Sequence, residues 1–394
     1  MAQRRSSAQA GFSRAGESGL SVTLAPMSST TSQSPENLRR SSIILAPMAG
    51  GPSTPELVAA VSNAGGVGTL AAGYLSVEKL TEQARKTYAL LDDGKGFGIN
   101  LFCPNTADAG VGTSEEELAQ WTAFRNRLKP AAAHFDIDLP DTPTWSDDYF
   151  SAKVEATLAD DFLANPDALK FVSFTFGYPD NEVIARVKES GRKVVLNATS
   201  IEGVRAAAEA GADRIVLQGL AAGGHRAFVK GKDSSDSIGA SVEELAQAVT
   251  EASAVTDVPI IAAGGVGNRE DVVKLVEAGA VAVQVGTRFL TTAEAGTKET
   301  HRRALRDLAE RDTVLTHAFS GKPARAIENT FTREFSRVAP ELYPQLHYLS
   351  APIRGAANKA GDSEYLNLWA GFAFAQCENQ PAREVVAELS GSAE

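Results

Sequence analysis

The sequence predicts an α/β protein: a closed (β/α)8 TIM barrel with an additional, mostly helical region that covers the substrate. Three observations predict this fold. Eight short apolar runs follow one another along the chain, helix-like stretches separate them, and glycine-rich loops follow the later runs. Runs that are apolar on both faces are typical of parallel strands with both faces covered. Eight such units suit a closed barrel better than an open doubly wound sheet, which is the competing prediction.

The predicted strands are rich in Val, Ile, Leu and Phe. They span residues 42–48, 66–72, 96–102, 171–176, 193–198, 214–218, 258–263 and 281–289. The helix after the first strand begins at Thr54-Pro55-Glu56, which supplies an N-cap, a proline at the first helical position and an acid in the first turn. Later helices end at Gly211 and Gly279, and each of these glycines is followed by alanine and the next strand.

The chain divides into three predicted parts. Residues 1–40 are expected to be a disordered tail, because polar residues dominate there without an apolar period, and Met27 is an alternative start. Residues 41–290 are the predicted barrel, with a helical excursion at 103–169. Residues 291–394 are expected to be mostly helical and to cover the active site, since barrel enzymes carry that site at the C-terminal ends of their strands.

Composition restricts the class of partner. The net charge of −11 argues against a nucleic-acid-binding face, which would have to be basic. No run approaches the roughly 18 apolar residues of a membrane span. The two cysteines, Cys103 and Cys377, lie far apart and show no metal-ligand spacing, so no metal site is predicted. Free thiols in a reducing cytoplasm are the simpler interpretation, with one disulfide as the alternative.

The loops after the last two predicted strands favour phosphate binding. Gly264-Gly265 follows the seventh strand, and Gln284-Val285-Gly286-Thr287 lies within the eighth. In TIM barrels these loops often bind phosphate through backbone N–H groups and a helix N-terminus, and glycine allows close approach. The alternative is that these glycines only make tight turns.

His225 is the candidate acid or base. It stands at the tip of a glycine-rich loop, Gly223-Gly224-His225, directly after the sixth strand. Histidine exchanges protons near neutral pH, and this position places it at the active-site end of a barrel. The alternative is a packing histidine, the role expected of the four others. Those are His134, His301, His317 and His347.

The first strand ends in Pro47-Met48 followed by Gly50-Gly51, which would let the backbone lie against a flat ring. This segment and several later ones resemble the motifs of a known family. Segments 46–51, 63–68 and 98–102 are similar to the opening motifs of class I nitronate monooxygenases. Segments 218–226, 262–265, 284–289 and 368–371 are similar to the later motifs, in the same order.

This resemblance implies non-covalent FMN at the barrel mouth. Pro47 and Met48 would lie along the isoalloxazine, and Asn100 and Gln218 would hydrogen-bond the flavin or its ribityl chain. His225 would face the substrate. The residues expected around the phosphate are Gly223, Gly224, Gly264, Gly265, Gln284, Val285, Gly286 and Thr287. Tyr343 and Tyr348 are candidates for the substrate pocket.

The implied reaction is oxidation of an alkyl nitronate, propionate 3-nitronate above all, by O2 to a carbonyl compound with nitrite or nitrate. His225 would deprotonate a neutral nitroalkane or, when protonated, bind the nitronate anion. Its partners would be small molecules, with a homo-oligomer as a possibility. The alternatives are an FMN-dependent NADH:quinone or enoyl-thioester reductase and, from another class, a flavin-free barrel that binds a phosphosugar.

Overall fold

The computed structural model describes residues 40–104, 114–229, 231, 233 and 238–391. Residues 1–31 separate from residues 32–394 as a different unit, and all that follows concerns the described part of the second unit. The predicted tail therefore lies outside the described residues, apart from Arg40, which begins the short helix η2 (Arg40–Ser42).

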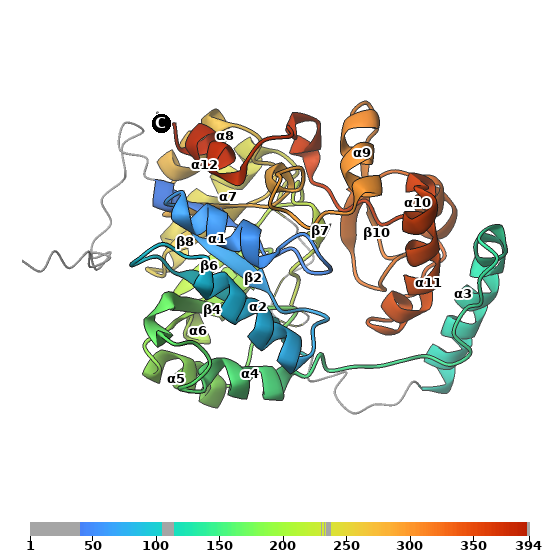
Figure 1. Cartoon of the computed structure of the whole chain (residues 1–394), viewed down its shortest axis with the longest axis horizontal. Helices are drawn as coiled ribbons and strands as arrows, with labels where there is room; N and C mark the ends of the chain where they lie inside the picture. Colours follow the sequence, from blue (N-terminus) through green and yellow to red (C-terminus); the bar gives the residue numbers. More distant parts are fainter. Residues whose placement is uncertain (1–39, 105–113, 230, 232, 234–237, 392–394) are drawn as a thin grey trace, which may run out of the picture. The chain divides into compact units, whose positions relative to one another are not determined.

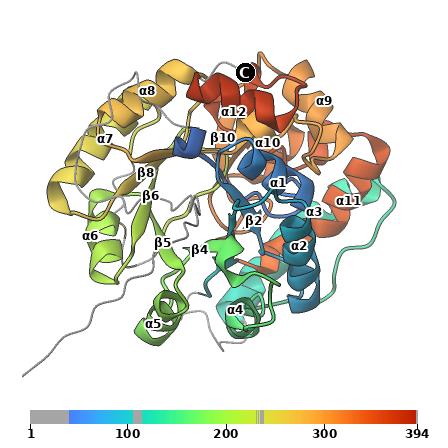
Figure 2. The same cartoon turned by 60° about the vertical axis from the view of Figure 1, so that its left-hand side comes forward.

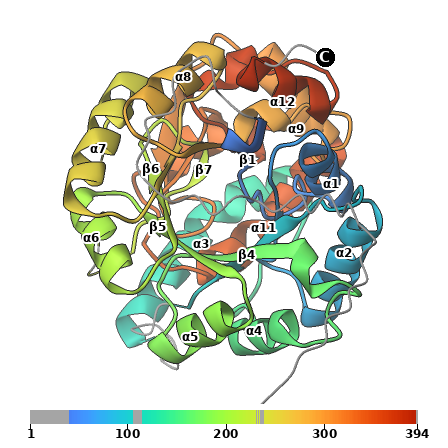
Figure 3. The same ribbon diagram turned by 90° about the vertical axis from the view of Figure 1, so that its left-hand side faces the viewer.

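Eight parallel strands form a nearly closed barrel, in the order β1-β9-β8-β6-β5-β4-β3-β2 (Figure 3). They are β1 (Ile43–Leu45), β2 (Gly68–Ala71), β3 (Phe97–Phe102), β4 (Leu169–Thr175), β5 (Lys193–Ala198), β6 (Arg214–Gln218), β8 (Ile260–Ala263) and β9 (Ala282–Val285). Val67 links the two ends of this order, because its N–H donates to the Ile43 carbonyl and its carbonyl accepts from the Leu45 N–H, each at 2.9 Å. Each strand overlaps its predicted run, and the predicted TIM barrel is confirmed.

Helices surround the strands (Figure 3). They are α1 (Pro55–Asn63), α2 (Val77–Ala89), α4 (Phe150–Leu158), α5 (Asn181–Glu189), α6 (Ile201–Glu209), α7 (Val242–Val255), α8 (Arg269–Glu277) and α12 (Ala382–Ser390). The start of α1 is as predicted: Thr54 caps it by accepting from the Leu57 N–H at 3.0 Å, and Pro55 follows. The eighth helix, α12, comes from the far end of the chain and packs against α1 and α8.

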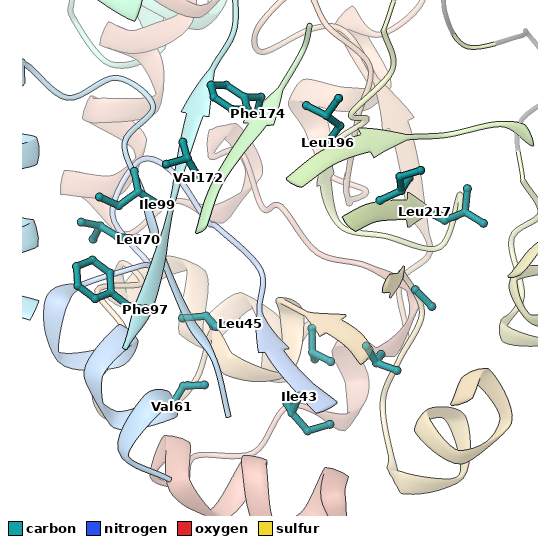
Figure 4. Packing of buried hydrophobic residues seen from close by; sticks show 14 of the residues in the cluster. Ile43, Leu45, Val61, Leu70, Phe97, Ile99, Val172, Phe174, Leu196 and Leu217 are labelled. Atoms are coloured by element: carbon teal, nitrogen blue, oxygen red, sulfur yellow. The ribbon is translucent and has the colours of Figure 1, made fainter. Parts of the chain in front are cut away.

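Side chains that alternate along a strand belong to two different buried clusters, one on each face of the sheet. Ile43 and Leu45 of β1 belong to the large cluster between strands and helices, whose side chains are drawn in Figure 4. Ile44, between them, packs instead with Val195 and Ile261 in the small cluster of the barrel interior. Successive strand residues point to opposite faces, and both faces are largely buried, so apolar residues predominate along the strands, with polar exceptions such as Asn100 and Gln218. This explains why the strands read as continuous apolar runs.

The region after β9 is not purely helical. Its helices are η4 (Thr287–Phe289), α9 (Glu299–Asp307), α10 (Thr330–Phe335), α11 (Gln345–Ala360), η5 (Ser363–Tyr365) and η6 (Phe372–Gln376). Two further strands, β10 (Thr313–Thr316) and β11 (Ala324–Ile327), form an antiparallel sheet with β7 (Gly224–His225). The sequence did not predict this sheet, because strands of two to four residues carry too short a pattern.

The excursion between β3 and β4 contains α3 (Glu115–His134), α4 and η3 (Pro166–Ala168). Helix α3 leaves the barrel and lies beside α10 and α11 (Figures 1 and 2). Trp121 and Phe124 of α3 share a buried cluster with Phe331 and Leu346, which lie two hundred residues later in the chain. We call α3 together with residues 313–371 the roof. Among the described residues, no helix is long and apolar enough to cross a bilayer.

Candidate active site

One cavity of about 260 Å³ lies where the carboxyl ends of the barrel strands meet the roof. It brings together all thirteen predicted site residues. They are Pro47, Met48, Asn100, Gln218, Gly223, Gly224, His225, Gly264, Gly265, Gln284, Val285, Gly286 and Thr287. Within the described parts of the chain, no group of three or more His, Cys, Asp or Glu side chains is placed to hold a metal ion.

Asn100 and Gln218 line the barrel side of the cavity. The Asn100 amide donates both of its N–H groups, to Ser173 Oγ and Thr175 Oγ1, each at 2.9 Å. Its Oδ1 is thus the atom that can serve a ligand, as an acceptor. Gln218 is bonded at both ends to the segment that carries His225: Nε2 donates to the His225 carbonyl at 3.1 Å, and Oε1 accepts from the Ala227 N–H at 2.8 Å.

The two glycine loops form a cradle that side chains would fill. Gly264 and Gly265 have φ of +121° and +76°, and a Cβ on Gly264 would lie 3.0 Å from the Ala222 backbone nitrogen. No described residue accepts a hydrogen bond from the backbone N–H of Gly265 or Gly286. Such donors suit a phosphate group, which accepts several hydrogen bonds at once.

The N-terminus of α8, which follows the Gly264-Gly265 loop, is capped by side chains of the protein. Asp271 Oδ2 accepts from the backbone N–H of Gly267 at 2.8 Å, and Asn268 Oδ1 accepts from the Asp271 N–H at 3.0 Å. These two side chains form a capping box at the start of α8.

His225 lies on β7 and not on a flexible loop, which corrects the prediction made from its glycines. It pairs with Ala324 of β11, and its Nε2 lies 2.8 Å from Ser320 Oγ. Its ring stands edge-on to Phe176, with centroids 5.5 Å apart, and 5.3 Å from Trp369. The sheet fixes the backbone of His225, while Ser320 and the aromatic rings fix its imidazole.

Burial lowers the pKa of His225 from its usual 6.5 to about 3, and the nearby cations Lys322 and Arg354 lower this pKa further. The imidazole is therefore neutral at physiological pH. A neutral ring can accept a proton, whereas the protonated form that would attract a nitronate anion is disfavoured before substrate binds.

The cavity wall carries cations but no acid. Lys298 and Arg354 line it, and none of the lining residues that the structure describes is Asp or Glu. Arg354 lies on α11, where Nε donates to Ser350 Oγ at 3.1 Å and Nη2 donates to the His347 carbonyl at 2.6 Å. The sequence pointed to neither cation. The spacing of the polar residues 347, 350 and 354 places them on one face of a helix, which could have indicated Arg354 as a site residue. This spacing is informative only once the segment is known to be a buried helix.

Two histidines expected to be packing or surface residues are at the cavity instead. His301 and His347 both line it, and burial lowers their pKa values to about 4 and about 2 respectively. These two histidines reach the cavity wall because distant elements fold over the barrel mouth. His134 and His317 agree with the prediction, since each lies partly exposed beside an acid, Asp362 and Glu341 respectively.

Tyr74 is a further site residue that the sequence did not indicate. It lines the cavity with φ of +67°, and its ring stacks on His347 with centroids 4.0 Å apart. Its hydroxyl accepts from that of Tyr343 at 3.4 Å. Tyr343 lines a smaller neighbouring pocket, whereas Tyr348 belongs to the wall of neither cavity. Neither of the two predicted tyrosines lines the main cavity.

Comparisons with known proteins agree with this fold. The family model for nitronate monooxygenase matches residues 36–391. A probable nitronate monooxygenase of Staphylococcus aureus is 34% identical over 350 residues, which cover 88% of this chain and 92% of that protein. The nitroalkane oxidase of Streptomyces ansochromogenes superposes with a TM-score of 0.80 at 37% identity, over 90% of this chain and 96% of that one.

A third structure, FabK from Thermotoga maritima, superposes with a TM-score of 0.64 at 23% identity, over 89% of this chain and 92% of that one, and shows the fold alone. The barrel, its site and the two closer relatives define an oxidoreductase of the TIM-barrel class. More specifically, the chain belongs to the nitronate monooxygenase family, whose members are flavoenzymes.

Proposed function

We propose that this chain catalyses the FMN-dependent oxidation of alkyl nitronates by O2, with propionate 3-nitronate as the principal substrate. One O2 with two nitronate anions gives two carbonyl compounds and two nitrite ions; with one nitronate it gives one carbonyl compound and one nitrate ion. The observation that carries the proposal is the neutral, buried His225 in a cavity whose lining cations are unaccompanied by acids.

The residues present fit FMN. The N–H groups of Gly265 and Gly286 would hold its phosphate, Asn100 Oδ1 would accept from the ring system, and Pro47 and Met48 would lie along its plane. When bound, FMN would supply the electron chemistry, taking electrons from the nitronate and passing them to O2. The chain's own residues bind and orient the substrate and handle its proton.

His225 would take the proton from the carbon next to the nitro group when the substrate arrives as a neutral nitroalkane. A pKa lowered to about 3 makes this ring a weak base on its own. The charge that develops on the substrate is negative, however, and the cation Lys298 lines the same cavity. This cation would stabilise the anion formed and so favour the transfer overall. A preformed nitronate needs no such step.

The test is an anaerobic comparison of reductants on the purified protein. We expect a yellow protein that releases about one equivalent of FMN on denaturation. Propionate 3-nitronate should bleach the flavin in the absence of O2, while NADH should not. Rapid bleaching by NADH alone would favour a reductase on the same barrel, and a protein that takes up no flavin on reconstitution would favour a phosphosugar enzyme.

A further inference from the structure

We propose that Arg354 determines substrate specificity by binding a carboxylate carried by the nitronate. The enzyme would then select nitronates with a second anionic group. This inference rests on the proposed function, because it takes the substrate to be a nitronate.

The guanidinium of Arg354 is held in a fixed orientation by its own helix. Nε donates to Ser350 Oγ and Nη2 donates to the His347 carbonyl, so two of its five N–H groups are used. No described residue accepts a hydrogen bond from the other three. Because Arg354 lines the cavity, these remaining donors are available to a ligand.

The charge of Arg354 is also without a protein counterion. None of the ion pairs among the described residues includes Arg354, and no carboxylate contributes to its pKa, which burial lowers to about 10. The side chain stays charged at neutral pH. An enclosed, unpaired charge is costly, and a ligand that brings the opposite charge relieves that cost.

A carboxylate suits this group better than the other anions expected in the cavity. The planar guanidinium fork matches a carboxylate through two parallel hydrogen bonds. The glycine cradle for phosphate comes from the barrel loops at Gly265 and Gly286, whereas Arg354 comes from α11 of the roof, beside the stacked pair His347 and Tyr74. Arg354 and His225 line the same cavity, and the charge of Arg354 lowers the pKa of His225.

The experiment compares two substrates of equal chain length, propionate 3-nitronate and propyl-1-nitronate, on the flavin-loaded protein. In Arg354→Gln we expect kcat/KM for propionate 3-nitronate to fall about 10- to 100-fold, mainly through KM, because a charge-assisted hydrogen-bonded contact is lost. The value for propyl-1-nitronate should change less than about threefold, and FMN content should stay the same. Propionate should inhibit the wild type competitively and the variant only weakly.

Two further variants make the result specific. Arg354→Lys keeps the charge but not the fork, so it should recover part of the loss and guards against a folding defect in the glutamine variant. Lys298→Gln removes the other lining cation, and it should not separate the two substrates. A selective loss in Lys298→Gln with none in Arg354→Gln would overturn the assignment.

An equal fall for both substrates, or a loss of FMN from Arg354→Gln, would place Arg354 with the flavin or the fold and would also overturn the inference. Its failure is distinguishable from failure of the proposed function. A wild type that oxidises neither nitronate contradicts the function itself, whereas a wild type that oxidises both, with Arg354→Gln unchanged on each, contradicts only the carboxylate site.

Discussion

At the scale of single residues, the site depends on what its environment does to histidine. Burial with Lys322 and Arg354 nearby keeps His225 neutral, and Ser320 Oγ at 2.8 Å orients its ring. The serine has one hydrogen to give. It donates either to His225 or to the Lys322 carbonyl, which lies 3.3 Å away, so the contact to Nε2 holds in either tautomer of the ring.

His225→Asn tests proton transfer at this residue. Asn keeps a polar side chain of similar size but takes no proton at neutral pH. Turnover of a neutral nitroalkane should fall by roughly 10²-fold or more, and turnover of a preformed nitronate should suffer less. FMN should be retained, because the proposed phosphate cradle at Gly265 and Gly286 lies on other loops. The measurement is steady-state kinetics with both substrate forms; an equal loss on both, with flavin intact, would make His225 a binding residue instead of a base.

At the scale of elements, buried polar contacts join the barrel to the excursion. Lys153 of α4 is fully buried, and its Nζ donates to the Ala72 carbonyl at 2.9 Å and to Asp148 Oδ2 at 2.7 Å. Asp148 Oδ1 in turn accepts from the Tyr74 N–H at 2.8 Å. These contacts fix the turn after β2, where Tyr74 has a positive φ and stacks on His347. The helix thus positions a cavity wall that it does not itself form.

Lys153→Met should lower the free energy of unfolding by about 3 kcal/mol, because it leaves the mostly buried Asp148 carboxylate without its cationic partner. Urea unfolding measures the change. The double variant Lys153→Met with Asp148→Asn is the control, and it should recover at least part of the loss, since no unpaired charge remains. A single variant as stable as the wild type would mean that solvent screens this pair.

At the scale of the whole molecule, three buried histidines make stability depend on pH. The pKa values of His225, His301 and His347 are lowered to about 3, 4 and 2, whereas in the unfolded chain each is near 6.5. Below pH 6.5 the unfolded chain therefore binds protons that the folded chain does not. Stability is complete above that pH and is lost as pH falls from about 6.5 towards 4.

Each of these histidines should contribute at most about 1.4 kcal/mol per pH unit to that slope. Urea unfolding at pH 7.5, 6 and 5 should show the decline. His301→Gln should make the slope shallower, and the matched variant of an exposed histidine, His134→Gln, should leave it unchanged. If both variants kept the full slope, protonation of other groups would govern the acid sensitivity.

The barrel was predictable because its strands are short and apolar on both faces, and the position of His225 followed from its place after the sixth strand. The roof was not predictable in the same way. Tyr74, His347 and Arg354 meet only because α11 folds back over the turn after β2, and nothing local in the sequence reports such a contact. The pairing of β7 with β11 was equally hidden, because a strand of two residues has no periodicity.

The late position of helix α12 in the chain has a consequence for folding during synthesis. It packs between α1 and α8, and its buried face includes Val385, Val386 and Leu389, yet it is made roughly a hundred residues after β9. While the chain is still emerging from the ribosome, the first strand and helix lack their last neighbour and keep an apolar face exposed to water. The layer of helices around the barrel is therefore complete only once residues 382–390 have been released.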